Sequence, residues 1–223
     1  AMLAPMTILK TTVRKDIPFA VLASGALFLL CLDDYIGRVD AGFLLILFVF
    51  FMGVTLTTAK PDAGAQTEAK KPMKPLVAIA WLLVGLVCLV LGSNVFVDSA
   101  TTVAQAIGIS DAVIGLTIVA GGTSLPELAT SAVAARKGNS GIAIGNVLGS
   151  NVFNILLILG VTGVISPMNI QGIGFVDLSV LFGSMILLWL FSFTKYTITR
   201  LEGALLSSIY IIYVGYLIVQ VVK

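Results

Sequence analysis

The chain has 223 residues, of which 58% are hydrophobic and 11% are charged, with a net charge of +2. Soluble domains carry about 25% charged residues, so this composition is typical of an integral membrane protein. The sequence contains no histidine, which excludes His-based acid–base catalysis and His-ligated metal sites. Cys31 and Cys88 lie within apolar runs, so we interpret them as packing residues and not as a disulfide or metal pair.

Long apolar runs fill the chain, and they predict membrane-spanning helices and not the alternating strands of a barrel. A spanning helix needs about 20 apolar residues. Gly, Pro and small polar residues interrupt the fourth and fifth of the spans that we predict. Seven spans are predicted, at residues 17–33, 42–58, 75–97, 112–135, 139–162, 174–194 and 203–222. We therefore expect an all-α polytopic membrane protein with seven transmembrane helices.

The basic residues are divided unequally between alternate loops. Of the 13 Lys and Arg residues, Arg38 and Lys223 fall on one side of the membrane, and the other 11 fall on the side of residue 1 and the hydrophilic linker 59–74. The positive-inside rule places that side in the cytoplasm and the C-terminus outside. We expect a multi-pass protein of the inner (plasma) membrane.

Two distant segments resemble each other. "APMTILKTTVRKDIPFAV" from Ala4 and "SPMNIQGIGFVDLSV" from Ser166 both open with Pro-Met and reach an Asp at the mouth of a span. The spacing stays near 162 residues through the following hairpins. The matching residues are Asp16 with Asp177, Arg38 with Arg200, and Asp40 with Glu202. Such weak internal symmetry is typical of transporters, although two membrane hairpins could also align by chance.

The repeat predicts how the protein is organised. Within its own copy, the second Pro-Met follows three spans, at 75–97, 112–135 and 139–162, whereas the first Pro-Met lies at residues 5 and 6. We therefore expect three further spans before residue 1 and ten in all. Residues 1–58 would then hold the last two helices of a first five-helix repeat. A cytoplasmic linker would follow at 59–74, and the second repeat would occupy 75–223. An odd number of spans inverts one repeat relative to the other.

Glu127 is the acidic residue that lies deepest within a predicted span. A charge at mid-bilayer costs about 2.5–3.5 kcal/mol on insertion scales, so such a residue indicates a functional site. Pro126 removes a backbone donor and should free carbonyls near residues 122 and 123. On a helix, Ala120, Ser124 and Glu127 share a face. With Thr123 beside them, they offer only oxygens, which hard cations such as Ca²⁺ and Na⁺ prefer.

The next span, "GIAIGNVLGSNVFN", carries two stripes of period four. One stripe is of glycines that permit close helix packing, and the other is of neutral oxygen donors. Each feature also has a structural interpretation: proline can kink a helix, hydroxyls can bond their own helix, and Asn can link helices. The combination favours an ion site in the hairpin 112–162. The stripes consist of Gly141, Gly145 and Gly149, and of Asn146, Ser150 and Asn154.

"GGTSLPELATS" and "GNVLGSNVFNILLILG" together resemble the α-repeat of the calcium/cation antiporters, specifically the prokaryotic sodium/calcium exchanger branch. The resemblance implies a ten-helix fold of two inverted halves, each with one α-repeat hairpin. This chain would contain helices four to ten, and its partner would be the N-terminal half with the first α-repeat. The proton/calcium branch has a Glu-His pair at its acid, which this His-free chain lacks.

The resemblance also implies roles for individual residues. Glu127 would bind Ca²⁺ and also contact Na⁺, with Ser124, Ser150 and Asn154 as side-chain ligands. The backbone oxygens of Ala120 and Thr123 would serve chiefly Na⁺. Asn at position 154, where other members have Asp, makes K⁺ dependence less expected.

We therefore expect a secondary active antiporter that exchanges Na⁺ for Ca²⁺ by alternating access, with helix 75–97 sliding past the α-repeat core. We expect no enzymatic activity, because no nucleophile–base pair is visible. We also expect no nucleic-acid partner and no cofactor beyond the transported ions. Proton-coupled exchange, with Glu127 titrating, is the first alternative. A cation channel is the second, but a channel would need a continuous polar stripe, and polarity here gathers near one depth.

Overall fold

The computed structural model describes residues 1–2, 5–58, 74–170 and 173–222. The chain divides into two compact units. The first holds Ala1–Pro61 and Ser131–Ser207, and the second holds Asp62–Thr130 and Ser208–Lys223. Apart from Lys74, the predicted linker at 59–74 lies outside the described residues. The predicted division into two five-helix repeats is a different kind of boundary and stays a prediction.

The fold is nearly all helical, as predicted, and six helical stretches within the described residues are long and apolar enough to cross a membrane. The predicted span 112–135 is instead a succession of short segments, and none of these reaches that length. The six stretches are Thr12–Asp33, which comprises η1 (Thr12–Asp16), α1 (Ile17–Leu30) and η2 (Cys31–Asp33); α2 (Arg38–Thr58); α3 (Pro75–Ala106); Ser140–Ile165, which comprises α7 (Ser140–Val152), η4 (Phe153–Ile158) and α8 (Leu159–Ile165); α9 (Phe175–Ser192); and Arg200–Gln220 of α10 (Arg200–Val222).

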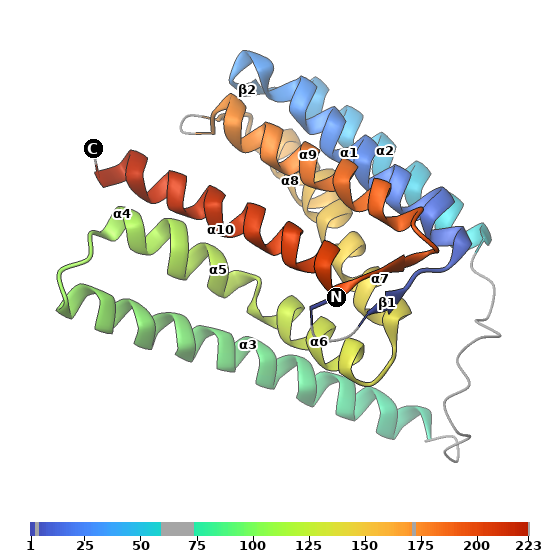
Figure 1. Ribbon diagram of the computed structural model, residues 1–223. Coiled ribbons are helices and arrows are strands. Elements are labelled where there is room, and N and C mark those ends of the chain that lie inside the picture. The colour runs from blue at the N-terminus through green and yellow to red at the C-terminus, as the bar shows by residue number, and fades with distance from the viewer. Residues whose placement is uncertain (3–4, 59–73, 171–172, 223) are drawn as a thin grey trace. The chain divides into compact units, whose positions relative to one another are not determined.

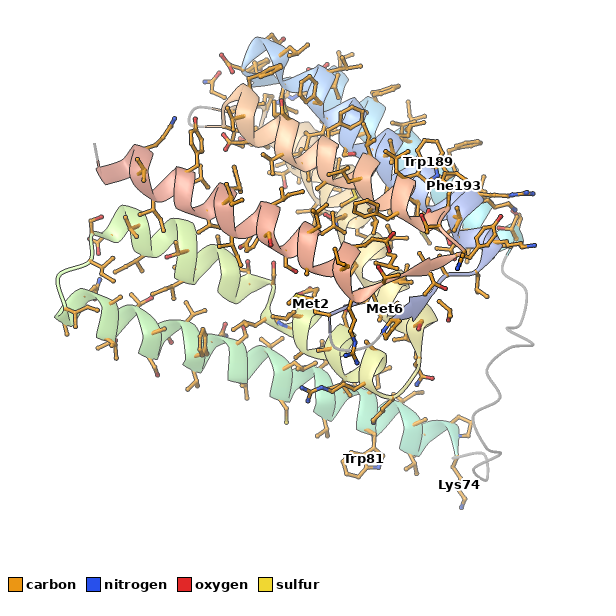
Figure 2. The ribbon with its side chains drawn as sticks, viewed as in Figure 1. Met2, Met6, Lys74, Trp81, Trp189 and Phe193 are labelled. Atoms are coloured by element: carbon orange, nitrogen blue, oxygen red, sulfur yellow. The ribbon has the colours of Figure 1, made fainter. Side chains whose placement is uncertain are left out.

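Close helix packing forms the core of the first unit. Helix α1 packs against α9, and α2 packs against α8, as Figure 1 shows. A Cβ atom added to Gly163 of α8 would lie 2.7 Å from the Cβ of Ala41, so α2 approaches where α8 has no side chain. The indole of Trp189 donates a hydrogen bond to the carbonyl of Val13 at 3.2 Å and its ring contacts Phe193 (Figure 2).

Two short antiparallel ribbons join the repeated segments within the first unit. Strand β1 (Met6–Thr7) pairs with β4 (Thr197–Ile198), and β2 (Tyr35–Ile36) pairs with β3 (Met168–Asn169). Strands β1 and β3 begin at residues 6 and 168, and strands β2 and β4 begin at residues 35 and 197. The corresponding strands of the two copies are therefore 162 residues apart in sequence. Each ribbon therefore combines a strand of one copy with a strand of the other.

The turns just before β2 and β4, which we call the corners, match in detail. Asp34 and Tyr196 both have left-handed backbones, with φ of 57° and 52°. Their carbonyls accept hydrogen bonds from Ile170 (2.9 Å) and Ile8 (2.8 Å).

The helix that follows each corner also begins in the same way. A carboxylate in its first turn accepts a hydrogen bond from the backbone N–H three residues earlier in the chain. Gly37 donates to Asp40 at 2.9 Å, and Thr199 donates to Glu202 at 2.7 Å. Since β1 precedes α1 and pairs with β4, which follows α9, the helices α1 and α9 run antiparallel. The sequence repeat is thus a structural repeat, and these two copies are inverted.

The second unit is built on α3. Helix α3 begins at Pro75, which suits the first helical position, and Gly108 follows its end with a φ of 84°. The sequence placed the end of this span at residue 97, where the apolar run stops. The helix continues to Ala106 because neither Gly nor Pro occurs between residue 97 and Gly108, so Asp98 lies inside α3 and not beyond it. Segments α4 (Asp111–Ile114), η3 (Gly115–Val119) and α5 (Ala120–Thr123) return alongside α3 (Figure 1).

Candidate ion-binding site

The chain between residues 111 and 136 is a broken helix. The π-helical turn η3 is followed by the single turn α5, and Ser124 then leaves the helical conformation (φ −94°, ψ 2°) before α6 (Leu125–Arg136) begins. Pro126 has no N–H to donate, so Gly122, four residues earlier, lacks its helical partner. The predicted disturbance of the helix before Pro126 is confirmed, and the break falls at Ser124. Pi-helical turns are rare and often mark functional sites.

Four of the six predicted ligands lie at this break, in the second unit. Ala120, Thr123 and Ser124 are exposed, whereas Glu127 is half-buried and its Oε2 atom is shielded from solvent. The hydroxyl of Thr123 donates to the carbonyl of Ala120 at 2.9 Å. A carbonyl oxygen has two lone pairs, so the Ala120 oxygen has capacity to bind a cation as well.

The carbonyl that Pro126 frees is engaged by another helix. Ser93 of α3 donates its hydroxyl hydrogen to the oxygen of Gly122 at 2.7 Å. The prediction of a freed carbonyl near residue 122 was right, but Ser93 was missed. A signal did exist in the sequence: the seven residues VLGSNVF occur at 90–96 and again at 147–153, where they contain the predicted ligand Ser150.

The other two predicted ligands belong to the first unit. Ser150 lies on α7, and its hydroxyl donates to the carbonyl of Val147 at 3.1 Å. Asn154 lies in the π-helical turn η4 and is exposed. The structure thus places the six residues in two groups, four beside a helix break and two on a continuous helix. Their convergence on one ion stays a proposal.

Asn146 takes the structural role that was left open for it. Its side-chain amide donates to the hydroxyl of Ser131 at 2.9 Å, which links α7 to α6 within the first unit. The glycine stripe differs from the prediction of close packing. A Cβ atom on Gly141, Gly145 or Gly149 would meet no described atom within 4 Å.

The chemistry available at the break is that of one carboxylate among neutral oxygens. Within the described part of the chain, no three His, Cys, Asp or Glu side chains gather as a metal-binding group. Glu127 therefore supplies the charge here, while hydroxyl and carbonyl oxygens supply the remaining donors. Oxygen ligands of this kind suit Na⁺ and Ca²⁺.

Comparison with known proteins gives consistent matches. The family model described as "Sodium/calcium exchanger protein" matches residues 77–219. The sodium/calcium exchanger MaX1 of Methanosarcina acetivorans is 57% identical over 90 residues, which cover 40% of this chain and 26% of that protein. The inner membrane protein YrbG of Escherichia coli is 33% identical over 184 residues, which cover 78% of this chain and 57% of that protein.

Solved structures agree with the sequence matches. A structure of the sodium-calcium exchanger NCX_Mj superposes with a TM-score of 0.79 at 31% identity, covering 96% of this chain and 69% of that one. The chain spans about half the length of the curated relatives that it matches along most of its own length.

Proposed function

The chain belongs to the sodium/calcium exchanger family, and we propose that it acts as a secondary active antiporter that exchanges Na⁺ for Ca²⁺ across a membrane. One observation carries the proposal: Glu127 lies directly after a helix break that presents hydroxyls and backbone carbonyls. In a bilayer, irregular backbone is tolerated where protein or a hydrated cavity satisfies its polar groups. A cation that binds there would complete the same set of oxygens.

Overlapping ligands explain how exchange would be coupled. Ca²⁺ takes 6–8 oxygens and depends on a carboxylate for charge compensation, so Glu127 would dominate its binding, with Ser124, Ser150 and Asn154 as further ligands. Na⁺ carries half that charge, and neutral oxygens would serve it, namely the backbone oxygens of Ala120 and Thr123 together with the side-chain oxygens of Ser124, Ser150 and Asn154. Since both ions need Glu127, they compete for the site, which favours exchange over joint leakage. Both ions are cargo, and the proposal involves no cofactor.

The charges at the two corners support an orientation in the inner (plasma) membrane. Helix α1 separates the β1–β4 ribbon from the β2–β3 ribbon, so these ribbons lie near opposite ends of a span. The positive-inside rule then favours the cytoplasm for the β1–β4 end, together with residue 1 and the linker 59–74. Near the first ribbon lie Lys10, Arg14, Lys15, Lys195 and Arg200, with the acids Asp16 and Glu202, and near the second lie Asp33, Asp34, Asp40 and Asp177, with Arg38.

The test is ion flux in proteoliposomes that contain the intact protein. Vesicles loaded with Na⁺ and diluted into Na⁺-free buffer should accumulate radioactive Ca²⁺, and vesicles loaded with K⁺ should not. A pH gradient without Na⁺, at clamped membrane potential, should drive little uptake. Uptake that follows the pH gradient would support the proton-coupled alternative, and uptake that requires no counter-gradient would support a channel.

A further inference from the structure

Helix α3 contacts the turn α5 (Ala120–Thr123), the proposed ion-binding turn, through two side chains one helical turn apart. Ser93 and Val97 are spaced i, i+4 and so share a face of α3. The Ser93 hydroxyl reaches the Gly122 carbonyl at 2.7 Å. A Cβ atom added to Gly122 would lie 2.0 Å from the Cγ2 of Val97. The contact therefore combines a hydrogen bond with a backbone approach that permits only glycine.

The hydrogen bond of Ser93 is unlike that of other hydroxyls in these helices. Thr102, Thr117 and Ser150 each donate to a carbonyl of their own helix three or four residues earlier, which is the common behaviour of such residues in membranes. Ser93 instead donates across 29 positions of sequence to the carbonyl that Pro126 leaves without a helical donor. An unsatisfied carbonyl in a bilayer is costly, so Ser93 compensates for the break.

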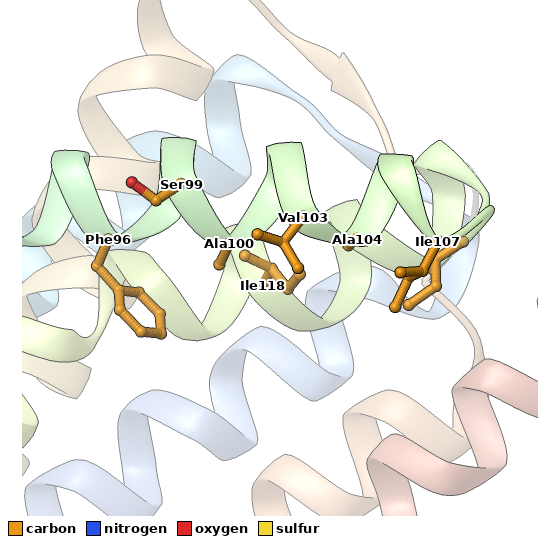
Figure 3. A pocket seen from close by; sticks show the side chains of 8 residues that line it. Phe96, Ser99, Ala100, Val103, Ala104, Ile107 and Ile118 are labelled. Carbon is orange, nitrogen blue, oxygen red and sulfur yellow. The ribbon is translucent and has the colours of Figure 1, made fainter.

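Apolar side chains line the neighbouring part of this interface. A groove of about 460 Å³ lies beyond Val97, and Figure 3 shows the side chains that surround it. A second polar tie, from Gln105 to Asp111 at 3.1 Å, lies at the far end of α3 and is exposed. Beside the proposed ion-binding turn, therefore, the hydrogen bond from Ser93 is the polar contact that α3 makes. The groove is lined by Phe96, Ser99, Ala100, Val103, Ala104, Ile107, Ile109 and Ile118.

We infer that Ser93 is a positioning residue for Na⁺ binding, which rests on the proposed function. Its hydroxyl fixes the peptide that follows Gly122 and so orients the neighbouring carbonyls of Ala120 and Thr123. Val97 sets the distance between α3 and the turn. The two copies of VLGSNVF differ in the residue that follows them: the copy at 147–153 precedes the proposed ligand Asn154, and the copy at 90–96 precedes Val97.

The first experiment separates Na⁺ from Ca²⁺ in flux assays on the intact protein. Ser93→Ala should raise the Na⁺ concentration for half-maximal exchange about fivefold to tenfold, because a buried carbonyl loses its donor. The half-saturating Ca²⁺ concentration depends chiefly on Glu127, and it should change less than about twofold. Ser93→Thr keeps the hydroxyl and should behave as wild type. Ser99→Ala is the matched control on the same helix and should change neither value.

The possible results distinguish this inference from the proposed function. If the wild-type protein exchanges the ions but Ser93→Ala leaves Na⁺ unaffected, or shifts both ions equally, the inference is wrong. Failure of Ser93→Thr to preserve Na⁺ affinity would also overturn it. Absence of Na⁺-dependent Ca²⁺ flux in the wild type would refute the proposed function itself.

The packing half of the inference is tested without transport. Gly122→Ala should lower the melting temperature in detergent, whereas Gly121→Ala should not, because a Cβ at residue 121 meets no described atom within 4 Å. Adding Val97→Ala to Gly122→Ala should recover most of the loss, since residues in contact couple non-additively. Equal tolerance of alanine at residues 121 and 122, or additive effects in the double variant, would show that the contact does not exist.

Discussion

The two stretches that supply the proposed ligands differ in how they present oxygen. Ala120–Glu127 is broken at Ser124, carries the carboxylate and exposes backbone. Ser150–Asn154 continues without a break from α7 into η4 and offers only neutral side chains. The comparison shows that the chain places its charge where the backbone is already irregular. A cation that binds there can satisfy both the carboxylate and the open turn.

The largest effect should come from removing the charge of the broken stretch. Glu127→Gln keeps the shape of the side chain but loses the anion, and Ca²⁺ transport should fall at least about a hundredfold, because a hard divalent cation depends on a carboxylate. The melting temperature in detergent should stay near that of the wild type. Glu202→Gln, which alters a helix cap in the first unit, is the control and should retain transport. Wild-type Ca²⁺ flux in Glu127→Gln would show that the site has been assigned wrongly.

A smaller effect should follow from making the two stretches alike. Pro126→Ala restores an N–H that can bond to Gly122, so the turn should close toward regular helix and withdraw its carbonyls. Transport should drop about tenfold while the melting temperature rises or stays unchanged, as expected where function depends on a strained site. The control is Pro75→Ala, since Pro75 is the first residue of α3, where proline is well tolerated. Full activity in Pro126→Ala would mean that the break is only a structural kink.

The smallest effect should come from the continuous stretch. Ser150→Ala or Asn154→Ala removes one neutral oxygen, so Na⁺ affinity in the flux assay should weaken about threefold to tenfold, the size expected for one polar contact. Maximal Ca²⁺ flux at saturating ion concentrations should be largely kept. Asn151→Ala is the neighbouring control, because Asn151 is not among the proposed ligands, although it donates to the same Val147 carbonyl as Ser150. Unchanged Na⁺ affinity in both variants would remove this stretch from the site.

The features that sequence predicted well are those with a local cause. Pro126 predicted a disturbed helix, and apolar run lengths located six of the spans. The 162-residue offset predicted a repeat that the paired corners then displayed in detail. Glu127 stands out in the sequence because burying a charge is costly wherever the rest of the chain lies, and its role as an ion ligand stays a prediction.

The features that sequence missed depend on distant partners or on weak local preferences. The two-residue strands β1 to β4 are too short for a periodic pattern, and each forms only because its partner is brought beside it. The turns η3 and η4 differ from α-helix by one residue of hydrogen-bond spacing, for which the sequence gives no rule. Ser93 resembles any serine of a membrane helix until Gly122 is placed opposite it.

The corner ribbons have a mechanical consequence for the first unit. Along the chain, helix α1 connects β1 to β2, and helix α9 connects β3 to β4. Hydrogen bonds then join β2 to β3 at one end and β4 to β1 at the other. The two antiparallel helices therefore form a closed loop that is fastened at both ends. To slide lengthwise past each other, the two helices would have to break the backbone hydrogen bonds of a ribbon. The α1–α9 pair can thus serve as a rigid frame, relative to which other helices of an exchanger could move.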